Sequence, residues 1–578
     1  MTLSDDIQKS NSLKTQTFEN KIKIGILSSF TIKGLEKSLQ ARCASFKIGS
    51  NTYMCGYNQY NQDILNLQSN LYKFSPDITF LILDTRSILG DLFYSPYKID
   101  AASRKKFIIN SIDNITNLCQ TFIKNSNSKL VISNFSIPTY SSYGIYEHKT
   151  EYGLKEMIWD LNKKLNEFVK NTSSVFLYDF NSFITKFGET NVFDYRQFFI
   201  GDIKIALNHI PKLADELLAF IKPIVGLNRK CIVLDLDNTL WGGVVGEDGF
   251  EGIHLSSKSP GNAFVEFQRH LLSLHERGII LAINSKNNED EAMKVIQEHP
   301  DMILREENFA CFKINWKDKV SNIKEIAFEI NIGLDSMVFV DDDPVNREFM
   351  KKSLPEVLTI DLPKDPSYFS QTLMSLTDFN VMKITEEDKK RGKMYQQQLN
   401  RTKLLNTSNS LQDFLNELNI TVKIKKNDKF SIPRISQLTL KTNQFNLTTR
   451  RYQEEDIKNF SQNNDIIVGS AEVEDKFGNN GISGAFIVRK NNPKEWNIDT
   501  FLLSCRVIGR GVEDAIMSHI LIEAKNQKIE RVYASYVPTK KNIPCKSFLD
   551  DFGFKKEGEN WVFDTKNDIN IPKHIVLK

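Results

Sequence analysis

The stretch that decides the fold is CIVLDLDNTLWGGVVGEDG, Cys231 to Gly249. Its first four residues are apolar and lead directly into two aspartates, Asp235 and Asp237, that are separated by one residue. An uninterrupted apolar run is typical of a parallel strand covered on both faces, and ligands of open α/β sheets bind beyond the carboxyl ends of such strands. The stretch therefore predicts a core strand that presents two carboxylates at a reaction site.

Three later segments place polar side chains at similar positions. Ser285 follows an apolar strand pattern over 279–283, Lys319 precedes a helical pattern over 320–330, and Asp341 and Asp342 come at the end of a pattern over 337–341. Further expected elements of this domain are strands over 302–304 and 357–360 and a helix over 263–276. Alternating strands and helices predict a parallel α/β sheet.

The four motifs suit phosphoryl chemistry. One carboxylate of the pair can attack phosphorus or bind a metal while the other transfers a proton, and the Ser285 hydroxyl can bind a phosphoryl oxygen. Asp341 and Asp342 can complete a Mg²⁺ site, because Mg²⁺ prefers hard oxygen ligands. Lys319 can neutralise phosphate charge, and we prefer it to Lys317 because a helix start also attracts anions.

The spacing of these motifs limits what covers the site. The intervals from Asp237 to Ser285 and from Ser285 to Lys319 leave room for a flap, a helix and a strand, but for no large cap domain. The site is therefore expected to be open. Such a site suits a bulky substrate, for example a group carried on a protein, unless a flanking domain covers it.

The motifs resemble those of the haloacid dehalogenase (HAD) superfamily, with Asp235, Asp237 and Thr239 as its D-x-D-x-T sequence. The resemblance implies that Asp235 is the nucleophile that forms an aspartyl phosphate. It makes Asp237 the general acid/base and a backbone-carbonyl ligand of Mg²⁺, places Thr239 at the substrate, and makes Asp342 a better candidate than Asp341 for the second carboxylate ligand.

A first α/β domain is expected over residues 20–222. Its strands are predicted over 22–27, 78–83, 130–135 and 175–180, with a helix over 109–123. Polar residues follow the strands or lie near the domain's end in places that resemble those of SGNH hydrolases: Ser28, Ser29, Asp84, Arg86 and His209. No GDS or D-x-x-H sequence accompanies them, so a hydrolase site and a scaffold that docks a partner both stay open, and we favour the scaffold.

The remaining boundaries follow from composition. The segment 222–230 carries a Pro and a Gly and is expected to link the first domain to a HAD-like domain over 229–380. A charged helical connector is expected over 381–410. The domain after it, 411–578, mixes strands with helices over 511–525 and 543–551, which predicts an α+β fold with a mainly antiparallel sheet.

A glycine-containing turn marks this last domain. Arg506, Gly509, Arg510 and Gly511 lie in SCRVIGRGVED, between a strand and a helix, where backbone N–H groups can approach a pyrophosphate. Together with the later PTKKNIPCKSFLDDFGF, which contains Asn542, the turn resembles the R-x-x-G-x-G loop of GNAT acetyltransferases. The resemblance implies binding of CoA or of a phosphopantetheine arm.

Nearly the whole chain resembles the FkbH-like (HAD-IIIC) family, in the motifs above together with NWKDK, FVDDDPVNRE and QLTLKTNQFNLTTRRY. The resemblance implies removal of phosphate from 1,3-bisphosphoglycerate and loading of the glyceryl group onto the phosphopantetheine of an acyl carrier protein, as in polyketide biosynthesis. Mg²⁺ is the implied cofactor. A phosphatase without acyl transfer and a non-catalytic protein that docks carrier proteins are the alternatives.

Such a transfer needs a nucleophile that holds the acyl group, and we predict Cys505. Arg506 and the following helix start would lower the pKa of its thiol, although a cysteine that ends an apolar strand can equally be a packing residue. Cys545 is the second choice. Asn443, Gln444 and Asn446 supply amides that can bind a polar acyl group or pantetheine, or that can cap a turn.

Composition sets no demand for nucleic acid or membrane. The chain has 75 Lys and Arg against 72 Asp and Glu, so its formal net charge is only +3. Its seven scattered cysteines contain no CxxC pair, which argues against a disulfide scaffold or a zinc site and favours a reducing cytoplasm. The absence of an apolar signal core or an 18-residue apolar run predicts a soluble, non-secreted protein.

Overall fold

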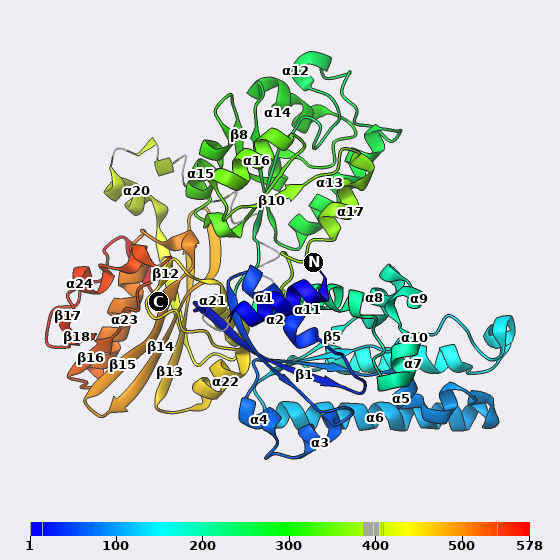
Figure 1. Cartoon of the computed structure of the whole chain (residues 1–578). Coiled ribbons are helices and arrows are strands. Elements are labelled where there is room, and N and C mark those ends of the chain that lie inside the picture. Colours follow the sequence, from blue (N-terminus) through cyan, green and yellow to red (C-terminus); the bar gives the residue numbers. More distant parts are fainter. Residues whose placement is uncertain are drawn as a thin grey trace. The chain divides into compact units, whose positions relative to one another are not determined.

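The computed structural model divides into two compact units, residues 1–225 and 226–578, each of which is described here by itself. Figure 1 shows the whole chain with its elements labelled. The structure describes residues 2–13, 16–384, 397, 401, 404–405, 407–408, 410–539 and 541–578. Most of the expected connector over 381–410 therefore lies outside the described residues.

The first unit is built on a parallel sheet in the strand order β2-β1-β3-β4-β5. Four of these strands fall where apolar runs predict them, since buried side chains on both faces stabilise them: β1 (Asn20–Ser28), β3 (Ile78–Ile82), β4 (Lys129–Ser133) and β5 (Val175–Tyr178). Helix α6 (Ala101–Asn125) contains the predicted helix and extends it at both ends, with Asp100 as its N-cap. Thus the predicted parallel α/β architecture is present.

The edge strand β2 (Ile48–Met54) was not predicted. It has a polar sequence, IGSNTYM, in which only Ile48 is buried. Its strand geometry comes from pairing with β1 rather than from an apolar pattern, because Ile48 to Met54 align with Asn20 to Ile26. A polar edge strand of this kind carries no periodic signal.

The second unit begins on a parallel sheet in the order β10-β9-β6-β7-β8, which places β6 (Cys231–Leu234) in the centre. The side chains of Ile232 and Leu234 pack into one core cluster, while those of Cys231 and Val233 pack into another. The opening stretch therefore forms a strand buried on both faces, as predicted. The other strands are β7 (Ile280–Ser285), β8 (Phe309–Ile314), β9 (Met337–Asp341) and β10 (Leu358–Asp361).

The strand predicted over 302–304 is wrong, because β8 lies further along the chain. Met302 and Leu304 are buried, which explains their apolar character, but the N–H groups of Ile303 and Leu304 donate to the side chain of Gln268 at 2.9 and 3.1 Å. The Gln268 side-chain oxygen thus accepts the backbone hydrogen bonds that a neighbouring strand would otherwise accept.

Helices cover both faces of this sheet (Figure 1). Helices α15 (Lys319–Glu329) and α16 (Pro344–Ser353) contribute to one core cluster. Helices α13 (Gly261–Glu276), α14 (Glu289–Glu298) and α17 (Phe369–Met374) contribute to the other. The carboxyl ends of β6, β7 and β9 therefore lie at one edge of a rigid, fully covered sheet.

The last part of the chain forms a sheet in the order β17-β18-β16-β15-β14-β13-β11-β19. Its pairs are antiparallel except for β15 with β16 and β11 with β19, so the predicted α+β class with a mainly antiparallel sheet is confirmed. The strands are β11 (Ile420–Lys426), β13 (Ile466–Asp475), β14 (Gly478–Asn492), β15 (Glu495–Leu503), β16 (Arg531–Ala534), β17 (Lys555–Glu557), β18 (Asn560–Asp564) and β19 (Ile575–Leu577).

Two helices of this last part were predicted, and one of them is interrupted. Helix α23 (Val512–Asn526) matches the expectation within one residue at each end. The helix expected over 543–551 is instead a short 3-10 turn, Ile543–Cys545, followed by α24 (Phe548–Phe552). Separately, none of the helices in the described ranges has the length and apolar character that crossing a membrane requires.

Candidate functional site

A buried ion triplet lies at the carboxyl edge of the second sheet. The Lys319 Nζ atom lies 2.7 Å from Asp235 Oδ2 and 2.6 Å from Asp341 Oδ2. Asp235 directly follows β6, Asp341 ends β9, and Lys319 begins α15, so three elements meet at one point. Because all three side chains are buried, their charges interact with little screening by solvent.

Asp342 extends this triplet into an acidic cluster. Carboxylate oxygens of Asp235, Asp341 and Asp342 all lie within 4.8 Å of one another. Burial, with Asp235 and Asp341 close by, raises the pKa of Asp342 to about 6. Burial likewise raises the pKa of Asp341, with Asp235 as the next cause. Three carboxylates share one lysine, and this excess of negative charge favours a bound cation.

The pKa of Lys319 depends on two opposing effects, burial and the neighbouring carboxylates. Burial alone would lower the pKa of this ammonium group, but the neighbouring Asp235 and Asp341 outweigh burial and raise it. Lys319 is therefore charged at neutral pH. Its competitor Lys317 is exposed and pairs instead with Glu325 at 3.0 Å, away from the acidic cluster.

Because Lys319 contacts the acidic cluster and Lys317 does not, substitutions of these two lysines form a matched test. Lys319→Met should lower phosphate release by about 10²-fold or more, since a positioned charge at the transferring group is lost. Lys317→Met should leave the rate within about twofold, because surface ion pairs contribute little. The steady-state rate of phosphate release from the phosphorylated acyl donor is measured for each of the two variants. Equal losses in the two variants would contradict the assignment of Lys319.

Asp237 is held by three donors. Its Oδ1 accepts hydrogen bonds from Trp241 Nε1 at 2.8 Å and from the Val245 N–H at 3.2 Å, and its Oδ2 accepts one from Asn287 Nδ2 at 2.8 Å. Burial nevertheless raises the pKa of Asp237. A carboxyl group with a raised pKa and a fixed orientation is suited to proton transfer.

Trp241 and Asn287 were not identified from the sequence. Trp241 lies four residues after Asp237, and its ring is fully buried, so it both fills the core and orients the carboxylate. Asn287 belongs to the Asn-rich run NSKNN, residues 284–288, which spans the end of β7 and was the available signal. An asparagine in such a run is more often a turn residue.

Removal of one donor tests the role of this support. Trp241→Phe keeps an aromatic ring but deletes the N–H that binds Asp237. We expect kcat to fall about tenfold, less than the 10² to 10⁴ that a general acid contributes. The Asn287→Asp variant provides a comparison in which the donor becomes a like charge. An unchanged kcat in Trp241→Phe would show that Asp237 needs no such support.

Two further predicted residues, Ser285 and Thr239, lie buried near this edge of the sheet. Ser285 is the last residue of β7 and is buried. The Thr239 side chain is fully buried, and its Oγ1 has no hydrogen-bond partner in the described part of the chain. An unpartnered buried hydroxyl is costly unless a ligand satisfies it, so Thr239 fits a position against a phosphoryl group.

Two further residues shape the site without having been predicted. Arg347 donates through Nη1 to the backbone carbonyls of Asp341 at 2.8 Å and Asp342 at 2.5 Å. Asn284 donates to the Lys319 carbonyl at 2.9 Å. Both fix the backbone that carries an acidic or basic side chain, and neither residue type reveals this from the sequence.

The predicted R-x-x-G-x-G turn has the backbone that its glycines require. Gly509 and Gly511 have φ of +75° and +78°, in the left-handed region. Gly511 is the N-cap of α23. The Gly509 N–H, however, already donates to Glu513 Oε1 at 3.1 Å, and burial raises the pKa of Glu513 to about 7. An internal carboxylate thus lies on one amide of the loop.

The two arginines of this turn are buried. Arg506 donates from Nε to Ser504 Oγ at 3.2 Å. Arg510 pairs with Asp475 at 3.4 Å, and Asp475 also binds Arg401 at 2.6 Å. Burial, with Arg401 as the next cause, lowers the pKa of Arg510 to about 10. The buried ion pair of Arg510 with Asp475, the last residue of β13, anchors the turn to that strand.

The predicted amides divide into two groups. Asn446 is fully buried; its Nδ2 donates to the Thr442 carbonyl and its Oδ1 accepts the Thr449 N–H. Asn542 is also fully buried, and its Nδ2 donates to the Asn446 and Val537 carbonyls. These two residues hold turns together, in contrast to the substrate and pantetheine roles predicted for them. Asn443 and Gln444 are half-buried and stay predictions.

The two candidate cysteines lie in different environments. Cys505 is half-buried at the start of a 3-10 turn that follows β15. Cys545 is fully buried, donates to the Asn542 carbonyl, and has its thiol pKa raised to about 11 by burial. A buried thiol with a raised pKa is a poor nucleophile, which favours Cys505.

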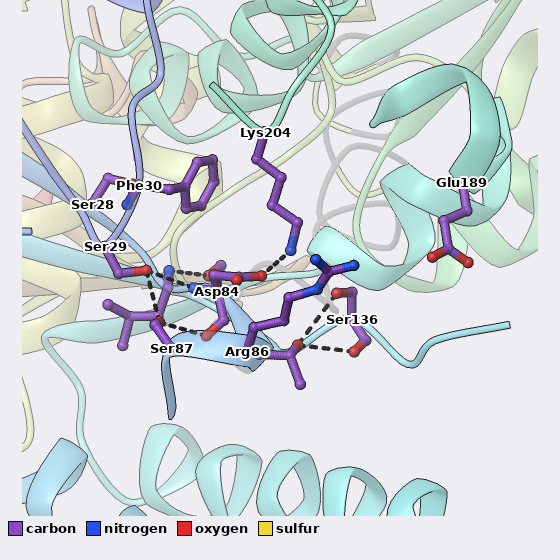
Figure 2. Close-up of polar contacts among 12 residues, drawn as sticks. Ser28, Ser29, Phe30, Asp84, Arg86, Ser87, Ser136, Glu189 and Lys204 are labelled. Atoms are coloured by element: carbon purple, nitrogen blue, oxygen red, sulfur yellow. Dashed lines mark hydrogen bonds and ion pairs between the residues drawn. The ribbon is translucent and has the colours of Figure 1, made fainter. Parts of the chain in front are cut away.

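The first unit does not join its serine to its histidine (Figure 2). Ser29 Oγ accepts the Asp84 N–H at 2.8 Å and contacts Ser87 Oγ at 3.1 Å. His209 instead contacts Asn208 and Lys212, and burial, then Lys212, lowers its pKa. Within the described residues no Ser-His contact of a hydrolase is recorded. Asp84 forms a buried ion pair with Lys204.

Comparisons with known proteins agree with this architecture. Residues 23–222 match the family model for the N-terminal domain of FkbH. The chain is 28% identical to the N-terminal part of the protein BF1531 from Bacteroides fragilis, which contains a phosphatase domain and is complexed with Mg. That match has a TM-score of 0.61 and covers 66% of this chain and 100% of that one. The fold is that of HAD-type phosphatase domains. Both findings support the resemblance to FkbH-like proteins of the HAD superfamily.

Other solved structures match smaller parts of the chain. Rv2747 from Mycobacterium tuberculosis, in complex with CoA and NLQ, is 18% identical with a TM-score of 0.19 and covers 23% of this chain and 72% of that one. An N-acetyltransferase from Staphylococcus aureus Mu50 is 16% identical with a TM-score of 0.20. That match covers 25% of this chain and 99% of the acetyltransferase chain. The comparison with curated proteins gave no match.

Proposed function

We propose that the HAD domain removes phosphate from a phosphorylated acyl donor, with Asp235 as the nucleophile. The observation that carries this proposal is Lys319, whose Nζ lies within 2.7 Å of both Asp235 and Asp341 at the carboxyl edge of the sheet. A phosphoryl group entering beside Asp235 would meet this fixed positive charge. The Mg-bound phosphatase domain of the Bacteroides fragilis protein supports the same reaction class.

Mg²⁺ fits the residues of this edge. Asp235, Asp341 and Asp342 place carboxylate oxygens within 4.8 Å of one another, and burial, followed by the neighbouring carboxylates, raises the pKa of Asp342. These are hard oxygen donors of the kind that Mg²⁺ prefers. The Asp235 and Asp342 carboxylates and the Asp237 backbone carbonyl would hold the ion, which would draw charge from the phosphoryl oxygens.

The protein side chains have separate tasks in this proposal. Asp235 attacks phosphorus and forms an aspartyl phosphate, and the leaving group departs with a proton from Asp237. Asp237 then takes a proton from the water that hydrolyses the aspartyl phosphate. Ser285 and Thr239 donate to phosphoryl oxygens, and Lys319 balances their charge. Trp241 and Asn287 keep Asp237 in the orientation that both proton transfers need.

The resemblance to FkbH-like proteins supports a second step. We propose that the donor is 1,3-bisphosphoglycerate and that its glyceryl group passes through Cys505 to the phosphopantetheine thiol of an acyl carrier protein. The half-buried thiol of Cys505 lies four residues before Gly509 of the R-x-x-G-x-G turn. The Cys505 thiolate attacks the C1 acyl carbonyl, which expels the C1 phosphate and forms the thioester, and Asp235 removes the remaining phosphate from C3. The carrier thiolate then attacks the thioester carbonyl and displaces the Cys505 thiolate.

One experiment separates this proposal from a phosphatase without acyl transfer. The full chain, Mg²⁺, 1,3-bisphosphoglycerate and a holo carrier protein are incubated together, and intact masses and released phosphate are measured. A glyceryl adduct on the chain or on the carrier supports the complete route. Phosphate release without any adduct supports the phosphatase alone, and neither signal favours a non-catalytic docking protein.

A further inference from the structure

The first unit has a crevice at the point where its strand order changes direction. From β1 the chain runs to β2 on one side of the sheet, whereas β3 continues to β4 on the other side. Ligands of open α/β sheets bind at the carboxyl ends of strands at such a point. Ser29 follows β1 and Asp84 follows β3, so their side chains lie at this position (Figure 2).

Lys204 reaches the same position from a later part of the unit. A β-bridge between Thr31 and Ile203 brings this segment beside the end of β1. The Lys204 Nζ forms a buried ion pair with Asp84 and lies 4.5 Å from the centre of the Phe193 ring. Burial lowers the pKa of Lys204, and the Asp84 carboxylate is its only acidic partner in the described residues.

Arg86 is the second cation at this crevice. Its guanidinium carbon lies 5.1, 5.7 and 5.2 Å from the centres of the Phe93, Tyr195 and Phe198 rings. Its recorded hydrogen bond is a long one, 3.4 Å, from Nη2 to the Tyr140 hydroxyl. No carboxylate lies within ion-pairing distance of Arg86 in the part of the chain that the structure describes. Aromatic rings therefore hold the guanidinium while most of its N–H groups lack a protein acceptor.

Arg86 and Lys204 face a common cavity. Both line a small hollow of about 10 Å³ together with Phe193, Asp194, Tyr195 and Phe198. Figure 2 shows the Lys204 amine and the Arg86 guanidinium directed toward the same space. Phe193, Asp194 and Tyr195 also line a larger open cleft of about 590 Å³, which His209 and Lys212 border.

The charges of the cavity define what it can bind. Asp84 neutralises Lys204, and the Asp194 carboxylate accepts the Gln197 N–H at 3.0 Å as the N-cap of α10 (Tyr195–Gly201). Arg86 is left with a positive charge and a planar set of donors that matches two oxygens of an oxyanion. The hollow itself has room for only about one water molecule. We propose that Arg86, with Lys204 beside it, binds the carboxylate or phosphate group of a small molecule at the open side of this cavity.

The site differs from a hydrolase site in its chemistry. Ser29 has no imidazole partner, and Lys204 is engaged with Asp84. The inference is therefore one of anion recognition by this unit, and it is independent of phosphoryl transfer at Asp235. The bound group could belong to a metabolite or to free phosphate, which is why both oxyanion types serve as probes.

Equilibrium dialysis of the full chain against labelled inorganic phosphate and, separately, labelled acetate tests the proposal. The variant is Arg86→Gln, and the matched control is Arg196→Gln, which removes an exposed charge from α10 beside the cavity. We expect Arg86→Gln to lose about one equivalent of bound oxyanion per chain relative to Arg196→Gln. Binding at the phosphoryl site contributes equally to both variants and cancels in the difference.

Each outcome decides between the possibilities. Loss of phosphate alone identifies a phosphate site, loss of acetate alone identifies a carboxylate site, and loss of both identifies a general oxyanion site. Equal binding by the two variants overturns the proposal, whether or not wild type binds either probe. Circular dichroism confirms that Arg86→Gln is folded.

Discussion

Asp235→Asn is expected to abolish phosphate release, by on the order of 10³-fold or more, because the amide cannot form the aspartyl phosphate. The domain should remain folded, since asparagine is nearly isosteric and the backbone N–H of residue 235 bonds the Val340 carbonyl at 3.0 Å in either case. Phosphate release and circular dichroism, measured on the same preparation, separate loss of chemistry from loss of fold.

A matched control guards against general effects of lost charge. Asp290→Asn removes an exposed carboxylate from the first turn of α14, in the same domain but outside the acidic cluster. This variant should keep wild-type activity within about twofold, as surface substitutions usually do. If Asp235→Asn released phosphate as fast as Asp290→Asn, Asp235 could not be the nucleophile.

Cys505→Ala is expected to separate the two proposed steps. Phosphate release should persist, because the Cys505 side chain packs against an apolar core cluster of the HAD sheet and is not part of the acidic cluster of Asp235, Asp341 and Asp342. Loading of the carrier protein should fall by about 10²-fold or more, because alanine cannot form the thioester. Intact-mass analysis of the carrier gives the loading rate, and a mass increase on the enzyme reports the intermediate directly.

The choice of control follows from the cysteine environments. Cys55 is the other half-buried cysteine of the described chain, and Cys55→Ala should load the carrier at the wild-type rate. Normal loading by Cys505→Ala would refute the thioester at this residue. Loss of loading together with loss of phosphate release would instead indicate that the substitution disturbs the whole second unit.

Much of the architecture could be predicted because buried parallel strands have an unambiguous sequence pattern. Cys231 to Leu234 and Met337 to Val340 are apolar throughout, and each lies in a strand at its predicted position. Strand β2 is stabilised by pairing rather than by burial, so its sequence resembles a loop. The 302–304 segment shows the reverse problem, since buried apolar residues can also be held by a single side chain such as Gln268.

The candidate site was predictable to the level of its charged groups. Strand ends bring Asp235, Asp341 and Asp342 together, and the helix start supplies Lys319, as the motif order indicates. The neutral partners were not predictable, because Trp, Asn and Gln side chains serve the core, turns and ligands alike. Trp241 was missed for this reason, and Asn446 and Asn542 were assigned to ligands although they bind the backbone.

The central position of β6 also governs how the site responds to local opening. β6 is hydrogen-bonded to β7 on one side and to β9 on the other, and all four of its residues are fully buried. Local fluctuations that fray an edge strand or a loop leave such a strand in place, so its amides exchange with solvent only when the domain opens as a whole. Asp235, which directly follows this strand, is therefore expected to keep its place for as long as the domain stays folded.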